Sequence, residues 1–316
     1  MHPAQITLIP LVGEGKVLSR VESFHSLISN TPEWKESLEK ADLVFFAAHS
    51  QGTPVAVLLL ERLIKDKRIH PDLQRVCILG MAGISHGPFP HLKSNLFVKY
   101  WEADPARELF EFNDPNSFIS ITYMTAIQRI LVSGAKFVTI GSWYDQVVPL
   151  YSAALYGIHH PSVYRALYID AADYLPDFLS HLVVFSLKLR NCGVADRGLL
   201  IHLSQILEGN IYGFGTQGHS ALYDEQSTYT MAIAWALISQ ETPVTLAVTS
   251  RFKAPHLSKL NPYHLPWIMA KLLSDDLPAE LKSELKAIVD MYPLWEPKTK
   301  EAKDLKYRLE ALHSKL

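Results

Sequence analysis

The chain has 316 residues, of which 48% are hydrophobic, so it is long enough to bury the core of one large α/β domain. Its formal net charge is −2, and this lack of a basic excess argues against nucleic-acid binding. With only two cysteines, a disulfide framework is excluded.

The sequence also bears on location. The N-terminus lacks the basic start and long apolar core of a secretory signal, and no apolar stretch reaches the roughly 20 residues that span a bilayer. We therefore expect an intracellular protein, by default cytoplasmic, without a transmembrane segment. Peripheral contact with a membrane is left open.

The first third of the chain alternates strand and helix patterns. In chain order we expect a buried strand over residues 5–12, a helix over 17–39, a strand over 41–48, a helix over 54–64 and a strand over 75–81. Strand, helix and strand in succession predict a parallel sheet with right-handed crossovers.

The middle of the chain loses this alternation. Between about residues 86 and 132, proline, aromatic and charged residues mix, and we interpret the stretch as a helical insertion over one face of the sheet. Helices are expected at 102–112 and 118–132 within it. Apolar runs beyond it predict strands over 136–141 and 164–169, and helices from Leu150 and over 178–190, 197–208 and 224–239.

The last part of the chain is divided by prolines and ends in a charged amphipathic pattern over 298–316. We therefore expect an α/β domain over residues 1–242, followed by a helical C-terminal appendage over 243–316.

The strongest local motif is Ala48-His49-Ser50-Gln51-Gly52, between an expected strand and an expected helix. A small-x-Ser-x-Gly turn in this setting is typical of a nucleophile elbow, which exposes the serine on a strained turn. Ala48 and Gly52 are small enough to let neighbouring backbone pass close. Ser50 is therefore the candidate nucleophile, and the Gln51 backbone N–H, at the start of the helix, is a candidate oxyanion donor.

Two further loops supply candidate partners for Ser50. Asp145, in Asp-Gln-Val-Val-Pro, follows a predicted strand and suits an acid that orients a histidine, although it would also suit a helix N-cap. His219 ends a glycine-rich loop over 209–218 that would let a base reach the serine. Together these residues predict a catalytic triad of Ser50, Asp145 and His219.

Other residues compete for these roles. Asp170 or Asp173, after the strand at 164–169, would be an alternative acid. Of the other histidines, His49 is expected to point away from the substrate, while the adjacent pair His159 and His160 comes too early in the chain and lacks partners at zinc spacing. No phosphate-binding loop or dinucleotide fingerprint is present. We expect neither a cofactor nor a metal.

Several stretches together resemble the α/β-hydrolase superfamily, with a lipase-like elbow, and more narrowly a group of uncharacterised fungal hydrolase-like proteins. The resemblance covers nearly the whole chain and is carried by the runs at 47–55, 81–84, 145–152, 218–220, 261–267 and 305–310. It implies an α/β-hydrolase fold, a mostly parallel sheet flanked by helices. The order of Ser50, Asp145 and His219 along the chain is the order that this fold uses.

The resemblance also shows a departure. Members of the superfamily have several strands and an oxyanion loop ahead of the elbow, often with His-Gly, and no His-Gly precedes Ser50 here. We therefore expect an N-terminally shortened form of the fold. Two functions follow as alternatives: a serine hydrolase acting on an ester of an apolar or lipid molecule, or a weakly active or inactive module that binds lipid or protein.

Overall fold

The computed structural model describes residues 5–93, 104–170, 174–209, 218–239, 249–250, 261 and 263–313. Within these residues the main sheet has the order β1-β2-β3-β5, and every neighbouring pair is parallel. The strands are β1 (Leu43–His49), β2 (Arg75–Met81), β3 (Lys136–Ser142) and β5 (Val163–Tyr168). A short antiparallel pair, β4 (Ile158–His159) and β6 (Thr249–Ser250), forms a second sheet.

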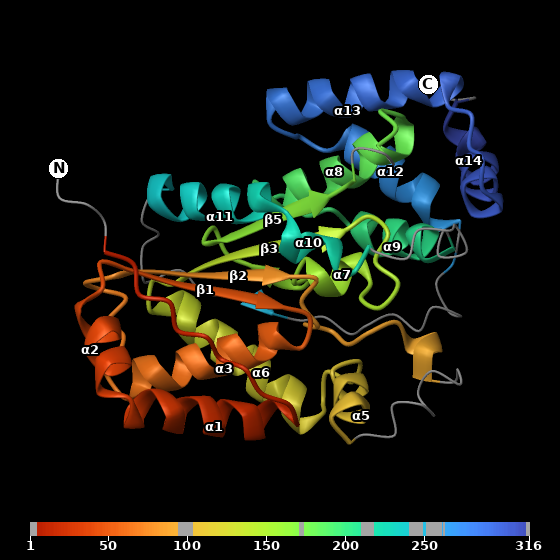
Figure 1. Ribbon diagram of the computed structural model, residues 1–316. Helices are drawn as coiled ribbons and strands as arrows, with labels where there is room; N and C mark the ends of the chain where they lie inside the picture. The colour runs from red at the N-terminus through yellow and green to blue at the C-terminus, as the bar shows by residue number, and fades with distance from the viewer. Residues whose placement is uncertain are drawn as a thin grey trace.

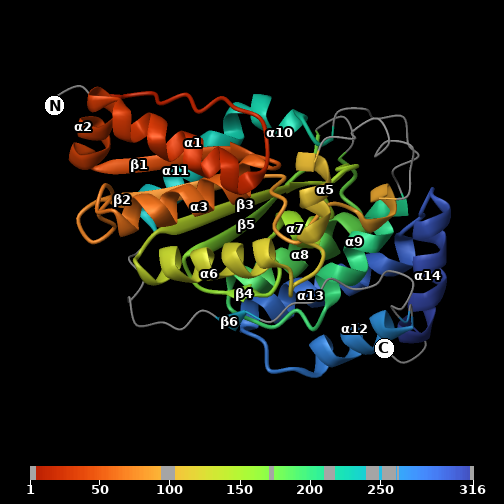
Figure 2. The ribbon, with the colours of Figure 1, turned by 90° about the horizontal axis from the view of Figure 1, so that it is seen from below.

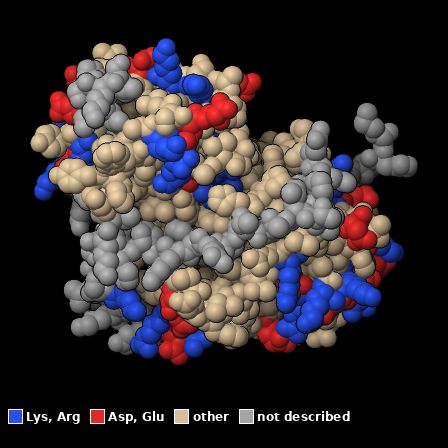
Figure 3. Space-filling view, turned by 180° about the vertical axis from the view of Figure 1, so that it is seen from behind, with Lys and Arg blue, Asp and Glu red and all other residues tan. Residues whose placement is uncertain are grey.

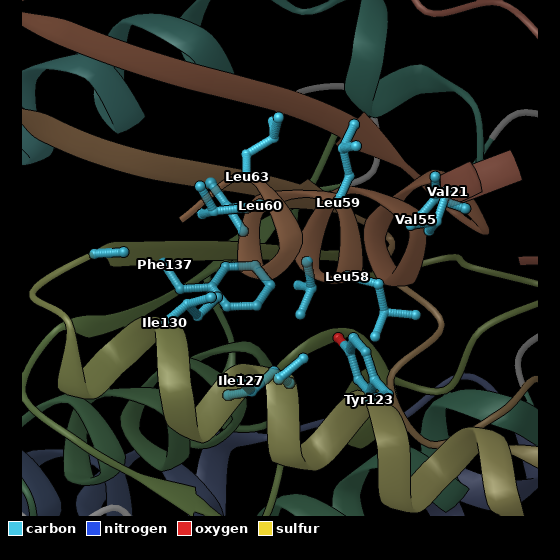
Figure 4. Close-up of a cluster of buried hydrophobic side chains, with 14 of the residues drawn as sticks. Val21, Val55, Leu58, Leu59, Leu60, Leu63, Tyr123, Ile127, Ile130 and Phe137 are labelled. Atoms are coloured by element: carbon cyan, nitrogen blue, oxygen red, sulfur yellow. The ribbon is translucent and has the colours of Figure 1, made fainter. Parts of the chain in front are cut away.

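Four helices lie on one side of the main sheet, below it in Figure 1: α1 (Val17–Asn30), α2 (Pro32–Lys40), α3 (Gly52–Lys65) and α6 (Phe118–Val132). The middle of α3 is buried on all sides because α1, α6 and the sheet all pack against it. Figure 4 shows the side chains of α3 and α6 facing one another beside Phe137 of β3. This layer supports the elbow from below.

Two helices cover the other face, above the sheet in Figure 1: α8 (Phe178–Asn191) and α11 (Gln226–Ile238). Alternate side chains of β2 pack against the helices on the two faces of the sheet. Ile78 belongs to the lower cluster with α3, whereas Cys77 and Leu79 belong to a separate cluster with α11. Burial on both faces accounts for the nearly continuous apolar composition of the central strands.

The remaining described helices lie around the carboxyl edge of the sheet and beyond it. They are η1 (Pro90–Lys93), α5 (Asp104–Glu111), α7 (Leu150–Ala153), α9 (Leu199–Gly209), α10 (Ala221–Asp224), α12 (His264–Ser274), α13 (Ala279–Met291), η4 (Tyr292–Leu294) and α14 (Lys300–His313). Helices α12 to α14 share one hydrophobic cluster with α8 and α9. The Trp295 indole N–H also donates to the Asp177 carboxylate at 2.9 Å. The C-terminal helices are therefore joined to the α/β part by a common core, and a boundary at residue 242 stays a prediction.

Two expectations for the N-terminal region were wrong. Residues 5–12 form no strand, and Ile6, Leu8 and Val12 are 87%, 82% and 90% exposed, because no described strand lies beside them to pair with their backbone. The helix expected over 17–39 is divided at Thr31, because Pro32 disfavours a helical conformation in the residue before it and starts α2 instead.

Helix α6 ends the stretch that we interpreted as an insertion. Its bounds were predicted correctly, but it packs against α3 in the layer beneath the sheet and connects β2 to β3 in sequence. The extent of an insertion between residues 86 and 132 therefore stays a prediction.

The surface carries both signs of charge. In Figure 3, which views the molecule from behind, Lys and Arg lie next to Asp and Glu on the upper and the lower part of the face. In the described residues, no helix is both long and apolar enough to cross a membrane.

Candidate active site

β1 and α3 lie side by side (Figure 2), and Ser50 lies on the sharp turn that joins the carboxyl end of β1 to α3. Its φ is +54°, a left-handed conformation that costs a serine of order 1–3 kcal/mol. Its backbone N–H donates to the Met81 carbonyl at 2.8 Å, while its own carbonyl accepts from Thr53 N–H at 3.1 Å. The expected strand–turn–helix setting of the elbow is therefore present.

Close backbone approach at the elbow involves different glycines from the one we singled out. A Cβ added to Gly52 would lie 3.8 Å from the Ala48 Cβ, which is an ordinary contact. A Cβ added to Gly80 or Gly83 would instead lie within 2.9 Å of the Thr53 side chain. The end of β2 and the turn after it, more than Gly52, are where the elbow requires glycine. The Gly-Met-Ala-Gly spacing of residues 80–83 was the sequence signal for it.

Asp145 lies in the loop after β3 and is only 6% exposed. One of its carboxylate oxygens accepts hydrogen bonds from the backbone N–H groups of Val147 and Val148, both at 2.8 Å. These bonds fix the carboxylate in one orientation. Asp145 therefore organises its own loop as a capping residue would, and still has oxygens available for a second partner.

That second partner is His219. Its Nδ1 lies 3.0 Å and 2.9 Å from the two carboxylate oxygens of Asp145, across 74 positions of sequence. Gly218 allows this approach, because an added Cβ there would lie 2.1 Å from the Tyr144 carbonyl oxygen. A carboxylate at Nδ1 leaves Nε2 as the nitrogen available for proton exchange.

Asp170, one of the two alternative acids, does not have this geometry. Asp170 is exposed, and its carboxylate is 3.4 Å from the Tyr168 hydroxyl. Asp173 lies outside the described residues, as does most of the glycine-rich loop before Gly218.

His49 has a position that sequence reasoning missed. We expected it to point away from the substrate side, but its Nε2 lies 2.7 Å from the His219 carbonyl oxygen. The two imidazole rings are 4.6 Å apart between centroids, and the Tyr223 ring contacts His49 edge-on at 5.1 Å. Alternation along β1 places His49 on one face of the strand, but gives no information about which distant loop meets it there.

The Gln51 side chain is held by Gly15, just before α1, and by Arg20, within α1. Its amide nitrogen donates to the Gly15 carbonyl at 3.2 Å, and its amide oxygen accepts from the Arg20 guanidinium at 3.3 Å. The backbone N–H of Gln51 therefore sits on a fixed turn at the start of α3. Within the described residues, the Ser50 hydroxyl makes no hydrogen bond to the His219 ring.

The described residues contain no group of three or more His, Cys, Asp or Glu side chains arranged to hold a metal ion. Burial lowers the pKa of both His159 and His160, which favours their neutral forms. A surface hollow of about 360 Å³ lies between the C-terminal ends of α3 and α6, lined by Glu61, Ile64, Lys65, Arg129 and Ile130. It lies at the opposite end of α3 from Ser50 and contains none of the candidate catalytic residues.

The chain matches the model of a known family. The model of the YMC0/YMC35 alpha/beta hydrolase domain matches residues 2–276, which include all the candidate site residues and run past the expected boundary at 242. Comparisons with curated proteins and with solved structures found no match.

Proposed function

Because the chain belongs to the YMC0/YMC35 alpha/beta hydrolase domain family and is a hydrolase-fold protein, we propose that it is a serine hydrolase that cleaves an ester. The observation that carries the proposal is the contact of His219 Nδ1 with both carboxylate oxygens of buried Asp145, at 2.9 and 3.0 Å. A histidine held in this way beside a strained serine elbow has the composition of a Ser-His-Asp triad.

The proposed reaction divides the work among four groups. Ser50 Oγ attacks the ester carbonyl carbon and gives its proton to His219 Nε2, while Asp145 stabilises the imidazolium. The Gln51 N–H donates to the oxyanion of the tetrahedral intermediate. His219 then protonates the leaving alcohol, and a water molecule activated by the same histidine releases the acid from Ser50.

We expect the hydrogen bond between Ser50 and His219 to form when substrate binds. Catalytic hydrogen bonds are often long or misaligned in a free enzyme and tighten when substrate binds. The alternative function, a binding module of low or no activity, is favoured by the same missing hydrogen bond. Hydrolysis of synthetic esters separates the two functions.

An apolar or lipid substrate is supported by the side chains near the carboxyl edge of the sheet. Tyr223 is 43% exposed and packs on His49, beside the proposed base. Tyr174 and Leu175, in the loop after β5, are also exposed, at 48% and 56%. An edge with exposed apolar groups favours an acyl chain over a polar substrate.

The test is hydrolysis of p-nitrophenyl esters of increasing acyl length by the wild type, Ser50→Ala, Asp145→Asn and Ser220→Ala. We expect turnover that increases beyond the acetyl ester, is abolished in Ser50→Ala and falls by about 10³–10⁴-fold in Asp145→Asn. Ser220 is exposed and does not cap α10 through its side chain, so Ser220→Ala is the matched control and should retain full activity. A folded wild type that hydrolyses none of the esters would favour the binding module.

A further inference from the structure

His49 contacts the proposed base through two kinds of interaction. Its Nε2 is 2.7 Å from the His219 carbonyl oxygen, and its ring lies 4.6 Å from the His219 ring at an interplanar angle of 54°. A carbonyl oxygen only accepts hydrogen bonds, so Nε2 of His49 carries the proton and donates it. The bond joins two residues that are 170 positions apart in the chain.

This hydrogen bond restrains the backbone of His219, whereas Asp145 contacts the His219 ring. The Asp145 carboxylate orients the His219 ring through Nδ1. The position of the ring relative to Ser50 depends also on the backbone of the loop that carries it. His49 holds that backbone by its carbonyl and is the residue directly before Ser50. Nucleophile and base are thereby tied together through one side chain.

The charge state of His49 suits such a role. Burial lowers the pKa of His49, and the nearby His219 also contributes to the lowering, while the hydrogen bond to the His219 carbonyl and the Asp145 carboxylate act in the opposite direction. Neutral His49 does not repel the imidazolium that forms on His219 during the reaction. Tyr223 is the second ring that packs against His49, through an edge-on contact.

We propose that His49 is a positioning residue, whose Nε2–H donates to the His219 carbonyl and sets the distance of the base from Ser50. The proposal rests on the proposed hydrolase function for its catalytic consequence, but not for the hydrogen bond itself. Because misplacing a catalytic group by about 1 Å can cost on the order of 10²-fold in rate, loss of this bond is expected to be visible in kinetics.

The test compares His49→Gln, whose amide nitrogen reproduces a donor at the Nε2 position, with His49→Leu, which has similar bulk and no donor. His49→Asn places its donor too near the backbone to reach and is a polar second variant without the bond. We expect kcat on the preferred ester to fall by about 10–100-fold in His49→Leu and His49→Asn with KM little changed. His49→Gln should stay close to the wild type.

A second readout is independent of activity. In protein with ¹⁵N-labelled histidine, the ring resonances of His219 are identified by their loss in His219→Ala. They should shift or broaden more in His49→Leu and His49→Asn than in His49→Gln, because all three variants lose the ring that lies 4.6 Å from His219 but only the first two lose the hydrogen bond. If the wild type hydrolyses no ester, the proposed function fails while this spectrum still decides the positioning. A His219 spectrum that is the same in folded His49→Leu and His49→Gln would overturn the inference, as would an unchanged kcat in an active His49→Leu or His49→Asn protein.

Discussion

The strain at Ser50 is held in place by a second strained turn. Ala82, directly after β2, also has a left-handed backbone, with a φ of +46°. Ser50 N–H donates to the Met81 carbonyl at 2.8 Å, and the Ser50 carbonyl is 3.4 Å from the Ile84 N–H. Each turn therefore restrains the other, as is required for two unfavourable conformations to persist.

Gly83 is the residue at which this arrangement is most sensitive to a single methyl group. In Gly83→Ala the new Cβ would lie 2.8–3.0 Å from three atoms of Thr53, so the first turn of α3 must shift. We expect a loss of about 1–3 kcal/mol in the free energy of unfolding, measured by urea denaturation.

Gly52→Ala is the matched control, because its Cβ meets only Ala48 at 3.8 Å and alanine favours a helix over glycine. It should be as stable as the wild type or slightly more so. Adding Thr53→Ala to Gly83→Ala should recover part of the loss, because it removes two of the three contacting atoms. Equal stability of the Gly83→Ala and Gly52→Ala proteins would show that the close approach is not as described.

At the scale of elements, the sequence predicted those whose cues are local. The bounds of α6 were predicted correctly from its apolar pattern, and Ser117 caps it by accepting from the Ser120 N–H at 3.2 Å. The bounds of β2 were also correct, because its strand is a short apolar run. The strand expected over residues 5–12 failed because strand formation needs a neighbouring strand, which no local pattern specifies.

In the candidate site, too, features with local sequence cues could be predicted and contacts between distant segments could not. Ser50, Asp145 and His219 were singled out because each follows a strand or precedes a helix in a recognisable run. Ser50 and Asp145 lie at the same edge of the sheet because the parallel strands β1 and β3, which precede them, end there. The contact between His49 and His219 could not be predicted, because it depends on the path of a loop 170 positions away.

At the scale of the whole molecule, buried titratable groups link helix α8 to loops from distant parts of the chain. Arg190 and Asp196 form an ion pair at 3.1 Å with side-chain exposures of 1% and 2%. Beside them the Tyr156 hydroxyl donates to Asp196, and the His86 ring contacts the Tyr156 carbonyl. Such an enclosed polar cluster makes stability depend on protonation.

The pKa of His86 sets the direction in which stability changes with pH. Burial lowers its pKa from 6.5 to about 4, so the folded chain resists a proton that the unfolded chain takes up. The contribution of neutral His86 to the free energy of unfolding is fully present above pH 6.5 and is lost as the pH falls towards 4. We expect the free energy of unfolding to fall by about 2 kcal/mol between pH 7 and pH 5 from this group alone.

His86→Gln is the variant that isolates this term, since its amide nitrogen reproduces the Nε2 donor without titrating. Urea denaturation at pH 7, 6 and 5 should show a flatter decline in the variant than in the wild type, whatever its stability at pH 7. Parallel declines in the two proteins would mean that His86 is protonated as easily in the fold as outside it.

The most direct test of the account is covalent labelling of the intact chain with a fluorophosphonate, followed by peptide mapping of the adduct. Such a probe reacts with a serine that a neighbouring base activates. We expect one adduct, on Ser50, that is lost in both Ser50→Ala and His219→Ala and retained in Ser220→Ala. A folded wild type that takes up no label, or takes it up on another residue, would contradict the assignment of Ser50 as an activated nucleophile.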